Sequence, residues 1–258
     1  MELGLKGRLA LISGGSKGIG LACAKALAAE GVRIVIASRS QDNIDAALAQ
    51  LPGARGYAVD LKSAAAAGDL VDAVEKDLGA VEILINSAGA AERTPPERLA
   101  PSHWQDAMDA KFFTYIHLID PLIKRMAAHG RGVIVNVIGA GGKVASPIHL
   151  PGGAANAALM LATAGLGKAY ASQNVRVVGL NPGPTETDRL IEAVKTQAAA
   201  LSISEDEVKA RIVANIPFGR VAQPEDIADV VTFLCSDRAG YVSGVTINMD
   251  GMQNAVVV

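Results

Sequence analysis

Seven short runs of apolar and mostly β-branched residues alternate along the chain with longer segments whose apolar residues recur at helical spacing. The short runs lie at 8–13, 32–38, 54–59, 81–86, 132–138, 175–181 and 245–249. Because each run is almost continuously apolar, the pattern is typical of parallel strands that are covered on both faces.

The helical segments lie at 18–30, 42–50, 64–78, 102–129, 152–172 and 224–236. Their alternation with the strands predicts an α/β fold of the Rossmann type: a doubly wound, mostly seven-stranded parallel sheet with helices on both faces. A chain of 258 residues fits one domain of this kind, from residue 1 to residue 258.

The longest departure from the alternation is a helical insertion at about 184–218. It carries two helical patterns, at 186–201 and 204–215, and in the second Ser204 is followed by Glu207 at the spacing of a capping box. An insertion at the carboxyl ends of the strands predicts a lid over a bound ligand. Its apolar composition favours a substrate that is not highly charged.

Three glycines follow the first predicted strand and open the first predicted helix. Gly14 allows a tight turn, Gly18 lets the backbone approach a pyrophosphate, and Gly20 lets the helix pack on its strand. The free N–H groups at the start of the helix then face negative phosphates. The arrangement of strand, glycine turn and helix predicts a dinucleotide site.

Composition narrows the function classes. Hydrophobic residues make up 50% of the chain, aromatic residues only 3%, and the net charge is −2 without a long basic run. We therefore expect a core of aliphatic side chains and no binding of nucleic acid. Cys23 and Cys235 have no partner at metal-ligand spacing, and the four histidines form no metal constellation. The absence of a signal pattern and of a long apolar run favours a cytoplasmic protein without membrane contact.

Several motifs in the right order resemble those of the short-chain dehydrogenase/reductase family. They are Ser13–Gly20, Asn86–Gly89, Asn181–Thr187, Pro224–Ala228 and the pair Asp250–Gly251. The resemblance covers nearly the whole chain and implies an oxidoreductase that binds a nicotinamide dinucleotide. The residues that it assigns to the cofactor are Gly14, Ser16, Lys17, Gly18, Ile19, Gly20, Ser38, Arg39, Asp60, Leu61, Asn86, Ala88, Gly89, Pro182, Gly183, Thr185 and Thr187.

The end of the second predicted strand indicates which cofactor is preferred. Enzymes that choose NAD place a carboxylate there, which accepts from the ribose hydroxyls. This chain has Ser38 and Arg39 instead, and the planar guanidinium of Arg39 suits a 2′-phosphate. Lys17, in the glycine turn, adds a second positive charge. The sequence therefore predicts NADP(H).

The catalytic residues of the resembled family are an Asn, a Ser, a Tyr and a Lys four residues after the Tyr, and this chain departs from all four. The aligned positions are Lys111, Gly139, Gly153 and Ala157, in that order. A shift of one residue brings neither a Tyr nor a Lys into place. The chain is thus an atypical member whose catalytic site is degenerate by this alignment.

Two side chains are candidates to replace the missing groups. Lys111 can supply a positive charge, and His149 carries an imidazole whose ordinary pKa suits proton transfer near neutral pH. Lys143 and Asn156 are weaker candidates. An atypical NADP(H)-dependent oxidoreductase is the leading hypothesis. A silent NADP(H)-binding sensor or partner subunit, and a non-redox lyase or epimerase, remain as alternatives.

Small residues are abundant between Gly152 and Ala164, where they permit close approach of two helices. In the resembled family the matching helix packs against its twin. We therefore expect a homodimer or homotetramer that acts on a small-molecule substrate, whose identity the sequence leaves open.

Overall fold

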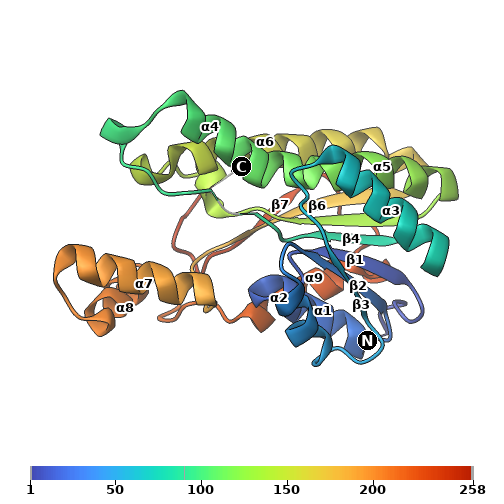
Figure 1. Cartoon of the computed structure of the whole chain (residues 1–258), viewed down its shortest axis with the longest axis horizontal. Coiled ribbons are helices and arrows are strands. Elements are labelled where there is room, and N and C mark those ends of the chain that lie inside the picture. The colour runs from blue at the N-terminus through green and yellow to red at the C-terminus, as the bar shows by residue number, and fades with distance from the viewer. Residues whose placement is uncertain (1, 90, 257–258) are drawn as a thin grey trace.

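The computed structural model describes residues 2–89 and 91–256 and contains a seven-stranded parallel sheet in the order β3-β2-β1-β4-β5-β6-β7 (Figure 1). The strands are β1 (Leu9–Ser13), β2 (Arg33–Ser38), β3 (Arg55–Ala58), β4 (Ile83–Asn86), β5 (Gly132–Val137), β6 (Val175–Pro182) and β7 (Thr246–Met249). Strand order reverses between β1 and β4. The predicted doubly wound α/β sheet is confirmed, and its switch point marks where a ligand is expected.

Helices cover both faces of the sheet (Figure 1). One face carries α1 (Gly18–Ala29), α2 (Gln41–Leu48) and α9 (Pro224–Cys235); the other carries α3 (Ala64–Leu78), α4 (Pro101–Ala107), α5 (Thr114–His129) and α6 (Leu150–Ala169). Each face has its own aliphatic core, because every central strand is buried on both sides. Among the described residues, no helix combines the length and the apolar character needed to cross a bilayer.

The segment predicted as one helix, 102–129, is interrupted. A π-helical turn, Met108–Phe113, separates α4 from α5. The Thr114 hydroxyl donates to the carbonyl oxygens of Lys111 at 3.0 Å and Ala110 at 3.3 Å, which partly replaces the regular backbone bonds of this turn. Hydrophobic periodicity continues across the turn, so the sequence pattern does not reveal it. Turns of this kind are frequent at functional sites.

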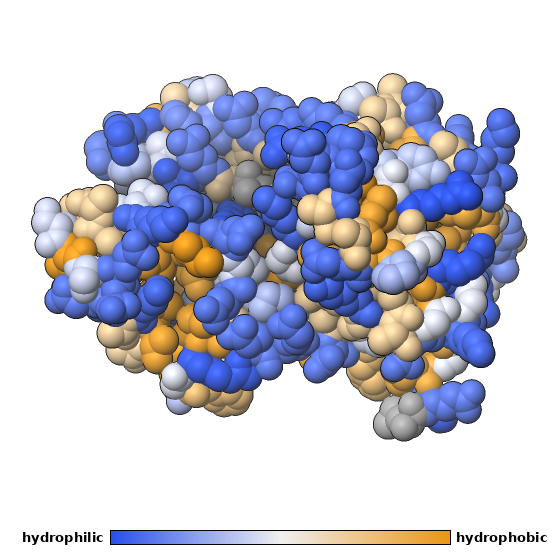
Figure 2. Space-filling view, turned by 60° about the horizontal axis from the view of Figure 1, so that its bottom comes forward, coloured by the Kyte–Doolittle hydropathy of each residue, from blue (hydrophilic) through white to orange (hydrophobic). Residues whose placement is uncertain are grey.

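Two helices, α7 (Asp188–Leu201) and α8 (Glu205–Ala214), form a hairpin at one end of the molecule (Figure 1). The hairpin has a small core of its own, made of Val194, Ala198 and Val208. The predicted capping box is confirmed: Ser204 Oγ accepts from the Glu207 backbone at 3.2 Å, and Glu207 accepts from the Ser204 backbone at 3.0 Å. On this side of the molecule, hydrophobic side chains lie exposed among hydrophilic ones (Figure 2).

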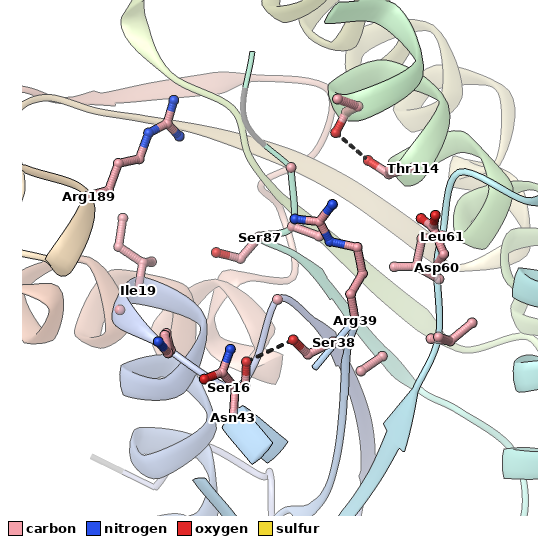
Figure 3. Close-up of a pocket in the computed structure, with 18 of the residues that line it drawn as sticks. Ser16, Ile19, Ser38, Arg39, Asn43, Asp60, Leu61, Ser87, Thr114 and Arg189 are labelled. Atoms are coloured by element: carbon pink, nitrogen blue, oxygen red, sulfur yellow. Dashed lines mark hydrogen bonds between the residues drawn. The ribbon is translucent and has the colours of Figure 1, made fainter. Parts of the chain in front are cut away.

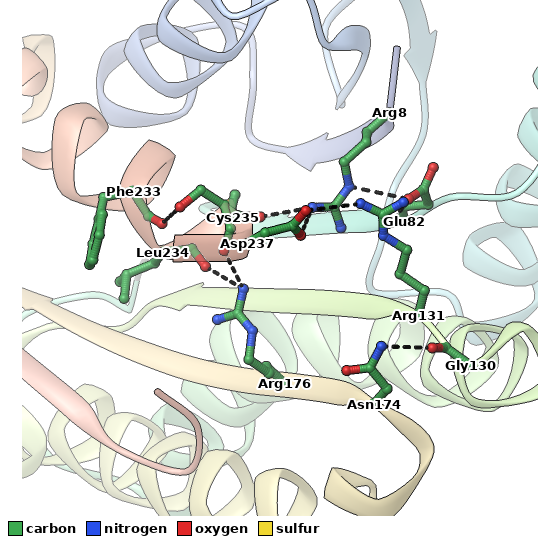
Figure 4. Close-up of polar contacts among 11 residues, drawn as sticks. Arg8, Glu82, Gly130, Arg131, Asn174, Arg176, Phe233, Leu234, Cys235 and Asp237 are labelled. Atoms are coloured by element: carbon green, nitrogen blue, oxygen red, sulfur yellow. Dashed lines mark hydrogen bonds and ion pairs between the residues drawn. The ribbon is translucent and has the colours of Figure 1, made fainter. Parts of the chain in front are cut away.

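An ionic network holds the amino ends of the strands, opposite the glycine turn (Figure 4). Arg8 is only 5% exposed; its guanidinium lies 3.2 Å from the Glu82 carboxylate and donates to the carbonyl oxygen of Cys235 at 3.0 Å. Arg131 shares the carboxylate partners Glu82 and Asp237 but has a side chain that is 46% exposed. Arg8 therefore joins β1 to the end of α9, whereas Arg131 adds charge at the rim.

We expect Arg8→Met to lower the free energy of unfolding by roughly 2–4 kcal/mol, because it leaves the buried carbonyl of Cys235 without its donor and removes the more buried of the two arginines that pair with Glu82. The matched control is Arg131→Met, which loses ion pairs with the same carboxylates at an exposed position and should cost less than about 1 kcal/mol. Urea unfolding followed by circular dichroism measures both. Equal losses in the two variants would contradict the role assigned to burial.

Candidate functional site

Glycines make the turn between β1 and α1 tight. Gly14 has a positive φ of +66°, and a Cβ on Gly20 would lie 2.3 Å from the carbonyl oxygen of Gly14. A side chain at either position would therefore be strained or would push the helix off its strand. The helix starts at Gly18 without a side-chain cap. Its first N–H groups thus remain available to an anion at the edge of the sheet.

A cleft of about 530 Å³ opens over this turn, at the carboxyl ends of β1 and β4 (Figure 3). Most residues that the sequence assigned to a cofactor line it: Gly14, Ser16, Lys17, Gly18, Ile19, Ser38, Arg39, Asp60, Leu61, Ala88, Gly89 and Thr187. Gly20, Asn86, Pro182, Gly183 and Thr185 are not among its lining residues. The structure thus brings together segments from five parts of the chain.

Several lining residues escaped the sequence analysis. They include Asn43, Lys62, Ser87, Thr114, Asp188 and Arg189. Arg189 follows Thr187 by two positions, in the first turn of α7. The segment was interpreted as an apolar cover, so its one basic residue at the mouth of the cleft was overlooked. Arg189 lies close in sequence to Thr185 and Thr187 of the cofactor motif, and this proximity is the signal that could have identified it.

At the cofactor end of the cleft, the polar side chains of the glycine turn have partners, whereas Arg39 has no ion-pair partner in the described part of the chain. Ser16 Oγ donates to Ser38 Oγ at 2.9 Å, joining the glycine turn to the end of β2. Lys17 Nζ lies 3.9 Å from the Asp188 carboxylate, so the glycine turn and α7 face each other with opposite charges. Arg39 forms no ion pair with any residue that the structure describes.

Buried amides support the cleft from below. The Asn86 side chain accepts from the Ser13 hydroxyl at 3.3 Å and donates to Asn136 at 3.0 Å, and Asn136 donates to Thr163 at 3.0 Å. These bonds connect β1, β4, β5 and α6. Asn181 on β6 accepts from the backbone N–H of Gly139 at 3.2 Å. Asn86 therefore lies beneath the cleft, where its amide fixes the strand ends.

Lys111 turns inward from the π-helical turn. It is 8% exposed, and its Nζ donates to Tyr115 Oη at 2.8 Å and to the carbonyl oxygen of Val137 at 3.0 Å. Tyr115 Oη donates to the same carbonyl at 2.6 Å. Burial, and then the positive charge of Arg189, lowers the pKa of Lys111 to about 7. The ammonium expected to face the missing lysine position is thus directed at the end of β5.

His149 occupies the space above Gly152 at the start of α6. A Cβ on Gly152 would lie 2.2 Å from the imidazole Cε1 and 2.4 Å from Nε2, so only glycine leaves room for the ring. The Nδ1 atom is buried and has no hydrogen-bond partner among the described residues. His149 is therefore a side chain held by packing, with a ring nitrogen that is not satisfied within the described chain.

A glycine-rich loop, Gly139–Gly142, packs against the start of α6 close to this imidazole. A Cβ on Gly139 would lie 3.2 Å from Asn156 Nδ2, and one on Gly141 would lie 3.5 Å from His149 Cδ2. A Cβ on Gly153 would lie 2.7 Å from the carbonyl oxygen of Gly141. Gly152 and Asn156 are buried toward His149 and Gly139, whereas Ala157 is exposed.

Positive charges gather around His149. Its pKa is lowered by burial first, then by the charges of Arg93, Arg189 and Lys111, while the Glu92 backbone opposes the shift. The imidazole is therefore neutral at pH 7 in the absence of a ligand. A neutral imidazole can still donate one N–H to a carbonyl oxygen. Among the described residues, no group of three or more His, Cys, Asp or Glu side chains could hold a metal.

Known proteins share this architecture. Residues 14–251 match the protein family described as enoyl-(acyl carrier protein) reductase. A 3alpha-hydroxysteroid dehydrogenase of Mediterraneibacter gnavus is 33% identical over 261 residues, which cover 97% of this chain and 98% of that protein.

Solved structures extend the similarity to the whole fold. L-sorbose reductase from Gluconobacter frateurii, complexed with NADPH and L-sorbose, has a TM-score of 0.93 at 28% identity and covers 100% of both chains. Actinorhodin polyketide ketoreductase with NADPH has a TM-score of 0.92 at 28% identity and covers 96% of this chain and 98% of that one.

The buried ammonium of Lys111 makes stability depend on pH. An unfolded lysine has a pKa of about 10.4, so between that value and a folded pKa of about 7 the unfolded state binds more protons. Stability therefore rises with pH across this window, and the cost of burying Lys111 is largest at and below pH 7.

We expect Lys111→Met to be more stable than the wild type at pH 7, and its advantage to shrink by about 2 kcal/mol between pH 7 and pH 9. Denaturant unfolding of both proteins at several pH values measures the difference. Lys124→Met, which removes an exposed lysine paired with Asp120 on the same helix, is the control and should show no such trend. A constant difference for Lys111→Met would refute the assigned pKa shift.

Proposed function

Because the chain belongs to the short-chain dehydrogenase/reductase family, we propose that it is an NADPH-dependent reductase of a carbonyl compound in which His149 replaces the tyrosine of the family. The observation that carries the proposal is the imidazole packed above Gly152, which has the cleft-lining Arg189 among its electrostatic neighbours. The family's tyrosine and lysine are absent there, and a residue able to donate a proton occupies the space.

The cleft fits a dinucleotide. Its floor is a glycine cradle that a Cβ on Gly14 would obstruct, since that atom would lie 2.8 Å from the carbonyl oxygen of Ser87. Free N–H groups at the start of α1 suit the pyrophosphate, and Asp60 and Leu61 line the adenine side. Arg39, at the end of β2, suits the 2′-phosphate of NADP(H). The NADPH complexes of the similar L-sorbose reductase and ketoreductase support this assignment.

The protein's part in the reaction is to place the carbonyl and to supply its proton. When bound, NADPH supplies the hydride that adds to the carbonyl carbon. His149 in its protonated form donates a proton to the carbonyl oxygen, which leaves a neutral imidazole and an alcohol product. The loop Gly139–Gly142 lacks side chains that would compete for the oxygen, and Asn156 offers an amide N–H beside it. The proposal takes Gly152 and Asn156 as the positions equivalent to the family's tyrosine and lysine, one residue before the aligned Gly153 and Ala157.

We also propose that the α7–α8 hairpin is the lid of this site. Thr187 Cγ2 lies 3.1 Å from the Cβ position of Gly18, and Asp188 faces Lys17 across the cleft. Copies of the chain are proposed to associate through α5 and α6, since Leu161 on α6 is 77% exposed.

We expect Arg39→Ala to weaken NADPH binding about ten- to hundred-fold while NADH binding stays the same, because a charge-assisted contact with the 2′-phosphate is worth about 1.5–3 kcal/mol. Fluorescence titration of both cofactors measures the change. Arg55→Ala removes an exposed arginine that pairs with Asp77 and does not line the cleft, and should alter neither affinity. A wild type that binds NADH as tightly as NADPH would contradict the assignment.

We expect Gly152→Ala to displace the imidazole and to lower turnover about 10²-fold or more, as loss of a general acid does, with NADPH affinity unchanged. Gly165→Ala is the matched control on the same helix, since a Cβ there meets nothing within 4 Å. NADPH oxidation is followed with a panel of aldehydes, ketones and oxo acids, and His149→Ala should reproduce the loss. Full activity in His149→Ala would overturn the proposed role. A wild type that binds NADPH but reduces nothing in the panel would favour a silent binding protein.

A further inference from the structure

We propose that the substrate of this reductase carries an anionic group, a carboxylate or a phosphate, that is held between Arg93 and Arg189 beside His149. The inference rests on the proposed function and names the class of substrate. Arg189 lines the cleft, and Arg93 lies on a loop that is hydrogen-bonded to the segment carrying His149. The charges of both arginines and of Lys111 act on the imidazole.

Arg189 reaches this place from the hairpin. It lies in the first turn of α7 and lines the cleft, and its guanidinium points away from Ser16 and Ser38 (Figure 3). Its electrostatic neighbours are Arg93, which lowers its pKa after burial has done so, and Tyr115, which opposes the shift. The guanidinium is thus turned toward the inner end of the cleft, away from the glycine turn.

Arg93 is held near His149 by its own loop. The next residue, Thr94, is buried and donates its backbone N–H to the carbonyl oxygen of Ile148 at 3.0 Å. On the other side of Arg93, Ala91 Cβ lies 2.8 Å from the Cβ position of Gly152. Residues on both sides of Arg93, one position after it and two positions before it, therefore contact the segment that carries His149, and this keeps the backbone of Arg93 close to that segment.

The charges of this cluster are unbalanced within the described chain. Arg93, Arg189 and Lys111 form no ion pair with any described carboxylate, and each of the three acts on His149 with the same sign. Arg93 and Arg189 are exposed and His149 is half-buried, so the positive charges lie at an open surface that solvent and ligands can reach. Like charges repel there, and a surface of one sign of charge concentrates ions of the other. An anion between the two arginines would offset this repulsion through charge-assisted hydrogen bonds.

The cofactor's own phosphates are the competing source of negative charge. The phosphates fit the glycine turn and Arg39. The charge of Arg189, in contrast, acts to lower the pKa of Lys111, Tyr115 and His149. The anion is therefore assigned to the substrate. The expectation of a weakly charged substrate rested on the apolar residues of the hairpin and left out Arg189.

Binding of such an anion would also act on His149. Neutralising Arg93 and Arg189 removes two of the three positive charges that lower its pKa, leaving Lys111. We expect the pKa of the imidazole to rise when the anion binds, which favours the protonated donor in the loaded site.

The test compares matched probes on the NADPH complex of the whole protein: 2-oxobutyrate against 2-butanone, and dihydroxyacetone phosphate against dihydroxyacetone. Calorimetry measures binding and NADPH oxidation measures turnover. We expect at least one anionic probe to bind about ten-fold or more tightly than its neutral partner. The two pairs distinguish a carboxylate from a phosphate. NMR titration of the His149 imidazole should show a higher pKa in the presence of the preferred probe.

Arg93→Gln and Arg189→Gln should each reduce the preference for the anion about ten-fold and leave NADPH affinity unchanged. Arg98→Gln, an exposed arginine of the same loop, is the control and should retain the preference. Anion binding without turnover would support the anion site and contradict the proposed reductase activity. Turnover of neutral ketones with no preference for an anion would do the reverse. Loss of NADPH affinity in Arg189→Gln, with the anion preference intact, would overturn the inference and assign Arg189 to the cofactor.

Discussion

The close approach between the Gly139–Gly142 loop and the start of α6 governs the chemistry of this chain. A Cβ on Gly142 would lie 2.7 Å from the backbone nitrogen of Ala157, and one on Gly153 would lie 2.7 Å from the carbonyl oxygen of Gly141. Side chains are thus excluded from the surface that the loop and the helix share. The space that remains is filled by one imidazole, and the arrangement persists only while glycine stands at each contact.

The fold was predictable from the sequence because its main signals are local. Continuous apolar runs identify parallel strands, and the glycine turn after β1 specifies where the first helix begins. The π-helical turn was not predictable, since Lys111 and Thr114 interrupt neither the apolar stripe nor the helix signals on either side. Most cofactor-cleft residues were predictable for a related reason: they belong to motifs whose spacing fixes their position.

The inner end of the cleft was less predictable, because its electrostatics depend on residues that are distant in the sequence. Arg93, Lys111, His149 and Arg189 come from four segments, and none belongs to a recognisable spacing. The sequence offers Lys111 and His149 only as candidates and does not reveal that one faces the end of β5 while the other faces Gly152. The direction of a side chain depends on how its surroundings pack. Here the packing depends on small residues such as Gly152, which leaves room for the ring of His149.

The ionic network at the amino ends of the strands bears on how such a site can arise. Arg8 and Arg176 connect β1 and β6 to the end of α9, at the edge of the sheet opposite the cleft (Figure 4). These anchoring contacts share no residue with the loops that carry chemistry. Mutations in those loops can therefore accumulate without loosening the scaffold. A catalytic apparatus can be dismantled and rebuilt in such a lineage while every intermediate sequence still folds, which gives evolution a route between two chemistries.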